Sequence, residues 1–252
     1  MERKRQPEFS RTEMLIGHEG MEILARSTIV VFGVGGVGSH AVEALARSGV
    51  GCLILADNDQ VALSNINRQS IACHSTVGRY KTEVMKEKIA DINPLCRVIA
   101  INQFILPDNL EPFFRQVFRE VSSVSYMIDA IDTVSAKLAI AEYGWKHSIP
   151  LISSMGTGNK LRPELFEITD IYKTSVCPLC KVMRRELKKR EIPCLDVLYS
   201  KEEPRKPLKA ADTEEETASQ TVRRSTPGSI AFVPPVAGLM IAGKVIRTLC
   251  GL

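Results

Sequence analysis

Glycines between two sequence patterns point to phosphate binding. Gly33, Gly35, Gly36 and Gly38 follow the β-branched run 28–32 and precede apolar residues at helical spacing. At a strand-to-helix turn, glycines let the backbone approach phosphate groups, and the helix directs its positive N-terminus at them. The pattern therefore predicts a nucleotide site.

Polar residues further along indicate the chemistry of this site. Asp57 ends the next apolar run, where an acidic side chain commonly accepts hydrogen bonds from ribose hydroxyls. Arg68 and Lys81 supply cations suited to a triphosphate. Asp132 supplies a carboxylate suited to Mg²⁺, which binds one or two carboxylates together with phosphate oxygens. The set favours nucleotidyl transfer, and hydride transfer by a nicotinamide enzyme is the weakest alternative.

An α/β fold is needed to bring these residues together. Short apolar runs without polar alternation are typical of strands covered on both faces. We predict strands at 28–32, 52–56, 97–101, 125–129, 150–154, 166–169 and 195–199. We therefore expect a Rossmann-like, mostly parallel sheet with helices on both faces, followed by an α+β substrate-binding extension.

The organisation of the chain follows from where this alternation stops. We expect one domain over residues 1–252, with an ATP-binding core at 11–154. A substrate-side extension at 155–199 carries an amphipathic basic helix at 179–190. The polar stretch 200–228 is predicted to be a mobile loop, because it has few apolar residues with which to offset its ordering entropy. Residues 229–252 are predicted to return to the core as a terminal strand and a helix.

The composition excludes disordered and fibrous proteins. Of 252 residues, 44% are hydrophobic and 25% are charged, as in ordinary globular proteins. The net charge of +4 is too small to prove a nucleic-acid partner by itself. Seven cysteines and an N-terminus without a secretory signal predict a reduced, cytoplasmic location. No membrane contact is expected, since the apolar stretch 232–249 contains two prolines and two basic residues.

Taken together, the motifs resemble the ThiF-type adenylating domain of the ubiquitin-activating superfamily. The marks GxGGxG, DxDxVxxSNxxRQ, a following lysine and a later aspartate all occur here in order. The resemblance implies that Asp132 binds Mg²⁺ beside an ATP site. That site would be formed by Gly33, Gly35, Gly36, Gly38, Asp57, Asp59, Asn65, Arg68 and Lys81.

The N-terminal stretch Phe9-Ser10-Arg11 matches another motif of this superfamily, in which the arginine reaches the ATP site of the partner subunit. The resemblance therefore implies a homodimer with shared sites. The catalytic residues would be Arg11, Arg68, Lys81 and Asp132.

Longer stretches, among them DAIDTVSAKLAI, ISSMGTGNKL and PGSIAFVPPVAG, are similar to the bacterial tRNA threonylcarbamoyladenosine dehydratases. This implies that ATP activates the carboxylate of the threonylcarbamoyl group next to the anticodon, and that the ring then closes with loss of AMP. The implied partner is tRNA carrying threonylcarbamoyladenosine, and the sequence leaves open whether a sulfur-transfer protein also docks. Two alternatives stay open: adenylation of the C-terminus of a ubiquitin-like or sulfur-carrier protein, and ATP sensing without turnover.

The basic helix is the candidate tRNA surface. Six basic residues and one acidic residue lie between 181 and 190, and cations that follow a phosphate backbone are the usual footprint of nucleic-acid binding. A solvated helix face is the alternative. The predicted tRNA-binding residues are Lys160, Arg184, Arg185, Lys188, Lys189 and Arg205.

Three smaller features complete the prediction. Asp129 is expected to support its strand end rather than bind metal. Gly156, Gly158, Asn159 and Lys160 follow the fifth strand, so they are plausible substrate contacts. The pair Cys177 and Cys180 is compatible with small residues at a helix start, with a redox or sulfur-relay role, or with zinc, although zinc needs about four ligands and no second pair is present.

Overall fold

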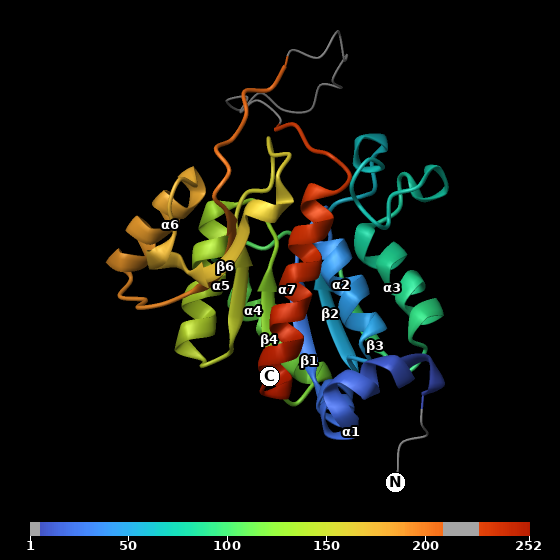
Figure 1. Cartoon of the computed structure of the whole chain (residues 1–252). Coiled ribbons are helices and arrows are strands. Elements are labelled where there is room, and N and C mark those ends of the chain that lie inside the picture. Colours follow the sequence, from blue (N-terminus) through green and yellow to red (C-terminus); the bar gives the residue numbers. More distant parts are fainter. Residues whose placement is uncertain (1–5, 209–226) are drawn as a thin grey trace.

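The computed structural model describes residues 6–208 and 227–252, and these form a layered α/β fold (Figure 1). In this part of the chain seven strands make one sheet in the order β3-β2-β1-β4-β5-β7-β6, and β6 alone runs antiparallel, against β7. The strands are β1 (Thr28–Phe32), β2 (Cys52–Ala56), β3 (Arg97–Ile101), β4 (Tyr126–Asp129), β5 (Leu151–Ser154), β6 (Phe166–Asp170) and β7 (Asp196–Ser200). The seven strands predicted between residues 28 and 199 are confirmed, with ends that shift by a residue or so.

Helices cover both faces of the sheet. α2, α3 and α7 lie on one face and α4 and α5 on the other, while α6 packs against α5 (Figure 1). The helices are α1 (Ser10–Arg26), α2 (Gly38–Arg47), α3 (Lys81–Ile92), α4 (Leu110–Glu120), α5 (Val134–Lys146), α6 (Pro178–Lys189) and α7 (Val233–Cys250). Short 3₁₀ turns at Pro7–Phe9, Leu63–Asn65, His74–Thr76, Pro163–Leu165 and Ile171–Lys173 connect them.

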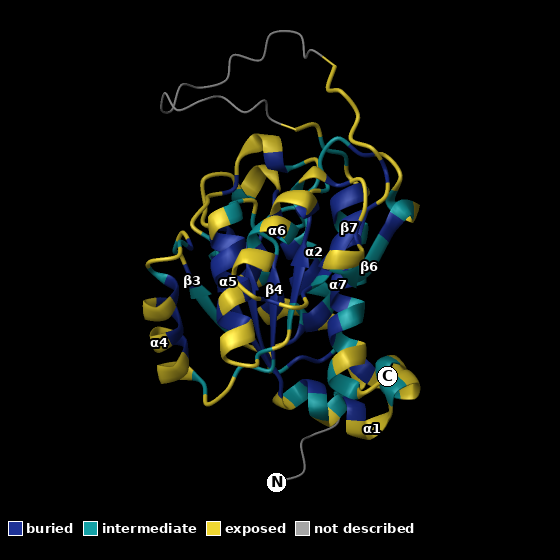
Figure 2. Ribbon diagram, turned by 90° about the vertical axis from the view of Figure 1, so that its left-hand side faces the viewer, coloured by how far each residue is buried: buried dark blue, intermediate teal, exposed yellow. Residues whose placement is uncertain are grey.

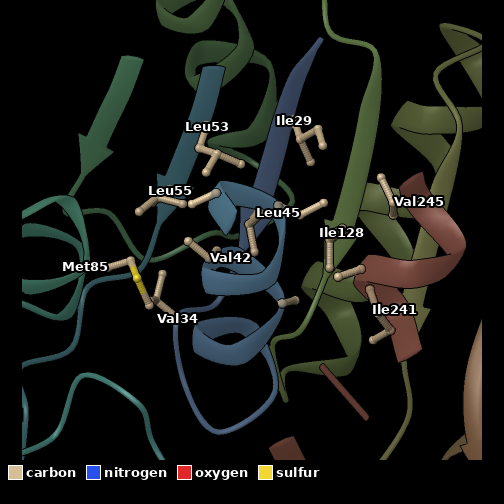
Figure 3. Close-up of a cluster of buried hydrophobic side chains, with 14 of the residues drawn as sticks. Ile29, Val34, Val42, Leu45, Leu53, Leu55, Met85, Ile128, Ile241 and Val245 are labelled. Carbon is tan, nitrogen blue, oxygen red and sulfur yellow. The ribbon is translucent and has the colours of Figure 1, made fainter. Parts of the chain in front are cut away.

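The central strands are buried on both faces, which explains their continuous apolar sequence. Ile29 and Val31 of β1 belong to the core under α2 and α7 (Figure 3). Val30 and Phe32 belong to the core under α4 and α5, where Phe32 lies 5.4 Å, ring to ring, from Phe113. Figure 2 shows these strands buried between helices whose outer sides are exposed.

The terminal helix α7 completes the first of these cores. It is long and apolar enough to cross a membrane by length and composition, yet Ile241 and Val245 are buried in the core beside α2 (Figure 3). A Cβ atom on Gly238 would lie 2.4 Å from the carbonyl oxygen of Val37, so only glycine lets α7 approach the start of α2 this closely. The predicted buried helix is confirmed.

The strand that the sequence predicts before α7 does not form. Residues 227–230 have no regular structure, and α7 begins at Val233. Their backbone bonds to loops rather than to the sheet: Gly228 N–H donates to Asn159 Oδ1 at 2.6 Å, and Ser229 C=O accepts from Asn67 at 3.0 Å. Most of the predicted mobile loop 200–228 lies outside the described residues.

Candidate functional site

A cavity of about 770 Å³ opens at the carboxyl ends of the parallel strands. Its walls include residues that follow β1, β2, β3, β4 and β5. β1 lies between β2 and β4, so the chain leaves β1 toward one side of the sheet and returns on the other. Open α/β sheets bind ligands at such a switch point. The cavity is therefore where this fold is expected to hold a nucleotide.

The glycine loop forms the floor of the cavity, and Gly33, Gly35 and Gly36 line it. Gly33 has a φ of +88°, and a Cβ atom there would lie 2.7 Å from the carbonyl oxygen of Ala130. Gly38 lies behind the loop, where a Cβ atom would lie 1.8 Å from the carbonyl oxygen of Gly33. The loop thus depends on Gly33 and Gly38 for its turn, while Gly35, whose Cβ atom would meet nothing closer than 3.8 Å, keeps the wall open to a ligand.

Asp57 ties the glycine loop to the segment after β2. One carboxylate oxygen accepts from Val34 N–H at 2.7 Å, and the other accepts from Asp59 N–H at 2.8 Å. The side chain lines the cavity, where its remaining lone pairs can accept from the hydroxyls of a ribose. Its predicted place in the site is consistent with this geometry.

Lys81, at the first position of α3, is held by Asp59. Its Nζ lies 2.7 Å from Asp59 Oδ2, and its backbone N–H donates to the Asp59 carbonyl at 3.0 Å. The Lys81 side chain is only 7% exposed, whereas that of Asp59 is 60% exposed. A buried ammonium group with an exposed counterion faces a cavity wide enough for phosphates, so a polyanion can take the place of the carboxylate.

Asn65 and Arg68 also line the cavity, from the 3₁₀ turn Leu63–Asn65 and the residues after it. Asn65 uses its side-chain oxygen to accept from Ala62 N–H at 3.1 Å. The Arg68 guanidinium donates to Ser64 C=O at 2.7 Å and to Asn67 Oδ1 at 2.8 Å. These contacts hold both side chains at the cavity before any ligand arrives.

Asp132 lines the cavity from the segment after β4. In the sheet, β4 and β2 lie on opposite sides of β1. Asp132 and Asp59 therefore approach the glycine loop from opposite sides. In the described residues no group of three or more His, Cys, Asp or Glu is arranged to hold a metal ion. One carboxylate together with nucleotide phosphates is nevertheless sufficient for Mg²⁺, which usually keeps several waters. The donor set therefore fits a metal that arrives with ATP.

Asp129 supports this segment and does not face a ligand. It is buried and pairs with Lys137 at 2.9 Å, and the hydroxyl of Ser153 donates to it at 2.6 Å. Its other carboxylate oxygen accepts from Ile131 N–H at 3.2 Å. The prediction of a supporting role is confirmed.

Asn159 joins three segments at the rim of the cavity. Its backbone N–H and side-chain oxygen both bond to Gly228, and its carbonyl accepts from Arg205 N–H at 2.8 Å. Gly156, Gly158, Asn159 and Lys160 all line the cavity, as expected for substrate contacts.

Sequence reasoning missed the wall that follows β3. Gln103, Phe104 and Ile105 line the cavity there. These residues carry no charge and no glycine pattern that would indicate a site. The signal that could have found them is their position shortly after a predicted strand, which places them at the same edge of the sheet as Asp57.

Arg11 lies outside the cavity of its own chain. It is exposed on α1, two residues after Phe9. The ring of Phe9 would lie 3.5 Å from a Cβ atom on Gly49, at the far end of α2. Figure 1 shows α1 at the end of the sheet where β1 begins, whereas the cavity is lined by residues that follow the carboxyl ends of the parallel strands. A role of Arg11 at an ATP site would require a second copy of the chain.

Two of the predicted tRNA-binding cations are bonded to backbone carbonyls of their own chain. Lys160 is only 5% exposed, and its ammonium group donates to Glu202 C=O at 2.6 Å. Arg184 is half-buried and donates to Thr174 C=O at 3.0 Å. The burial of Lys160 argues against direct contact of its ammonium group with tRNA phosphates. Arg184 keeps some exposed surface, so its contact with tRNA stays a prediction.

Arg185, Lys188, Lys189 and Arg205 remain exposed. Arg185 and Lys189 each lie within 3.1 Å of Glu186. Hydrogen bonds from Lys189, Arg190 and Arg185 lower the pKa of the Glu186 carboxyl to about 2. The positive face of α6 is thus partly neutralised by its own acidic residue.

A model of the ThiF family matches residues 9–252 of this chain. The chain is 45% identical over 247 residues to the tRNA threonylcarbamoyladenosine dehydratase of Bacillus subtilis, covering 96% of this chain and 94% of that protein. It is 30% identical over 157 residues to the sulfur carrier protein ThiS adenylyltransferase of Escherichia coli, covering 61% and 60%. The crystal structure of the E. coli tRNA threonylcarbamoyladenosine dehydratase in complex with ATP matches with a TM-score of 0.83 and 32% identity, over 97% of this chain and 94% of that one.

Proposed function

The chain belongs to the ThiF family, and on that basis we propose that it dehydrates threonylcarbamoyladenosine in tRNA to the cyclic nucleoside at the expense of ATP. The observation that carries the proposal is the convergence of the glycine loop, Asp57, Lys81 and Asp132 in one cavity. The 45% identity to the Bacillus dehydratase over almost the whole of both chains supports this substrate.

In the first step a carboxylate oxygen of the threonyl group attacks the α-phosphorus of ATP. The bond from phosphorus to the bridging oxygen breaks, and pyrophosphate leaves with the electron pair. The cations Lys81 and Arg68 and the positive end of α2 stabilise the charge that develops on pyrophosphate. Lys81 exchanges its Asp59 carboxylate for phosphate oxygens in this step.

Mg²⁺ bound with ATP would be held by Asp132 and would neutralise charge on the phosphates. Asp129 and Lys137 keep the segment 130–132 in place, so the carboxylate of Asp132 is presented from a rigid support. This chain needs to provide no further metal ligand.

In the second step an atom of the carbamoyl group attacks the activated carbonyl carbon. The bond from carbon to AMP breaks, the carbamoyl group loses one proton, and AMP leaves. The net change is loss of one water from the nucleoside with conversion of ATP to AMP and pyrophosphate. Since both reacting groups are on the same nucleoside, proximity supplies much of the acceleration and no enzyme nucleophile is required.

The proposal includes a homodimer in the reduced cytoplasm. The distance of Arg11 from its own cavity supports a shared site. On the same helix Met14 and Leu15 are 83% and 85% exposed, so α1 offers an apolar surface near Arg11 to a second subunit. Cys52, Cys73, Cys177, Cys180, Cys194 and Cys250 form no disulfide in the described part of the chain, as suits a reducing compartment. tRNA contact is proposed through the exposed cations of α6 and Arg205. Docking of a sulfur-transfer protein stays a prediction from the sequence.

The test is mass-spectrometric nucleoside analysis of threonylcarbamoylated tRNA incubated with the protein and Mg-ATP. We expect the nucleoside to lose one water, and we expect Asp132→Ala to abolish this loss. Asp91→Ala, which changes an exposed carboxylate on α3 outside the cavity, is the matched control. An unchanged nucleoside, with pyrophosphate exchange that instead needs a sulfur-carrier protein, would establish the alternative function.

A further inference from the structure

We propose that Cys177 and Cys180 form a dithiol that peroxides oxidise reversibly to an intramolecular disulfide. The proposed adenylation chemistry has no use for either thiol. The inference rests on where the two sulfur atoms lie, what surrounds them and how an oxidant reaches them.

The two cysteines occupy facing positions at the start of α6. Cys177 is the N-cap residue, and Cys180 is the third residue of the helix. Residues three apart on a helix are neighbours, and both cysteines pack in one buried cluster with Met183 and Leu187. The partner that would close a disulfide therefore lies within one helical turn, in the same buried cluster.

The surroundings favour a thiolate at Cys177. The hydrogen bond from Cys180 lowers the pKa of Cys177, and the backbone N–H groups of Cys180 and Leu179 and the ammonium group of Lys160 add to the effect. The same hydrogen bond and burial raise the pKa of Cys180. Thiolates, not thiols, attack peroxides and disulfides, so the pair contains one nucleophile and one resolving thiol.

Small oxidants have a path to this pair. Cys177, Pro178 and Leu179 line the cavity, although Cys177 is only 6% exposed and Cys180 is fully buried. Two other cysteines, Cys73 and Cys194, are exposed. Burial, followed by the charges of Asp170 and Asp196, raises the pKa of Cys194. Exposure alone therefore predicts oxidation at Cys73 and Cys194, whereas the arrangement of α6 predicts it at Cys177.

The reaction balances in two steps. The Cys177 thiolate attacks one oxygen of hydrogen peroxide, the O–O bond breaks, and hydroxide leaves, which gives a sulfenic acid. Cys180 then attacks that sulfur, loses its proton, and water leaves as the disulfide forms. The two thiols are oxidised by two electrons and the peroxide is reduced. The product no longer presents a negative sulfur to Lys160, so the charge of this cavity wall becomes more positive.

The test treats the reduced full-length protein with hydrogen peroxide at pH 6, labels the remaining thiols under denaturing conditions, and quantifies each cysteine peptide by mass spectrometry. We expect the peptide with Cys177 and Cys180 to lose two hydrogens and both labels, at least about tenfold faster than Cys73 loses its label, because the lowered pKa of Cys177 raises its thiolate fraction and Cys180 lies beside it to resolve the sulfenic acid. A thiol reductant should restore both labels. Faster oxidation of Cys73 and Cys194 would overturn the proposal.

Two variants separate the roles of the thiols. Cys180→Ser should stop the reaction at a sulfenic acid on Cys177 that dimedone captures, and Cys177→Ser should leave Cys180 unoxidised. Cys73→Ser is the matched control and should behave as the wild type. If a variant does not fold, the wild-type peptide measurement still decides, since a labelled pair after peroxide treatment contradicts the inference.

Discussion

The ammonium group of Lys81 lies 2.7 Å from the carboxylate of Asp59, and the backbone N–H of Lys81 donates to the carbonyl of that same residue. The side chain that the site offers to phosphate is therefore positioned by a double contact before ATP arrives. When phosphate oxygens replace Asp59 as the partner of Lys81, the Asp59 carboxylate remains hydrated, because it is already exposed to water.

Lys81→Ala should slow ATP–pyrophosphate exchange by about 10²-fold or more, the usual loss when one group that stabilises developing charge is removed. Lys86→Ala is the control, because Lys86 is exposed on the same helix and does not line the cavity. Equal exchange rates for the two variants would remove Lys81 from the proposed chemistry.

Gly38→Ala should lower the stability of the fold, whereas Gly35→Ala should lower the affinity for ATP. A Cβ atom on Gly38 meets the carbonyl oxygen of Gly33 at 1.8 Å, so the backbone must shift and the melting temperature should fall by several degrees. A Cβ atom on Gly35 meets nothing closer than 3.8 Å, so that variant should melt like the wild type. Gly35→Ala should nevertheless weaken ATP binding in calorimetry, since the added methyl group points where the phosphates approach. A wild-type ATP affinity for Gly35→Ala would show that the phosphates lie elsewhere.

Lys137→Met should destabilise the fold by about 3 to 5 kcal/mol in urea unfolding, because it leaves the buried carboxylate of Asp129 without its counterion. Adding Asp129→Asn to this variant should recover part of the loss, since no buried charge then remains. Lys146→Met, on the exposed end of the same helix, should change stability little. Equal stabilities of the single and double variants would contradict the ion-pair explanation.

Mixing Arg11→Ala with Lys81→Ala protein should restore activity if sites are shared. In a mixed dimer one site would combine the intact Lys81 of one subunit with the intact Arg11 of the other, so about a quarter of all sites would be complete. Each variant alone should be inactive, and activity should return with the rate of subunit exchange. No recovery after complete exchange would place Arg11 outside the partner's site.

Much of the site could be predicted, because residues that directly follow parallel strands meet at the same edge of the sheet. Gly33, Asp57 and Asp132 each follow a predicted strand, and the parallel order of β2, β1 and β4 brings them to one edge. Phe104 obeys the same rule, but an apolar side chain carries no signal of chemistry in a sequence.

Contacts between distant segments could not be predicted. Lys160 is held by a carbonyl 42 residues later in the chain, and nothing in a local pattern reveals such a partner. The segment before α7 has strand-like apolar residues, yet its backbone bonds to Asn159 and Asn67. In both cases tertiary hydrogen bonds, and not local sequence propensity, determine the position of the side chain or the conformation of the backbone.

The position of α7 has a consequence for how the protein is made. Pro234 packs on the glycine loop, where a Cβ atom on Gly36 would lie 3.0 Å from it, and Gly238 lies against the first turn of α2. Both residues come after every strand of the sheet in the chain, so they are synthesised after the sheet. Until α7 has been made and has packed, α2 exposes the apolar side that α7 covers, so the nucleotide site is completed after the sheet. A truncated product without α7 would have the glycine motif without a finished pocket, and its uncovered apolar surface would favour aggregation.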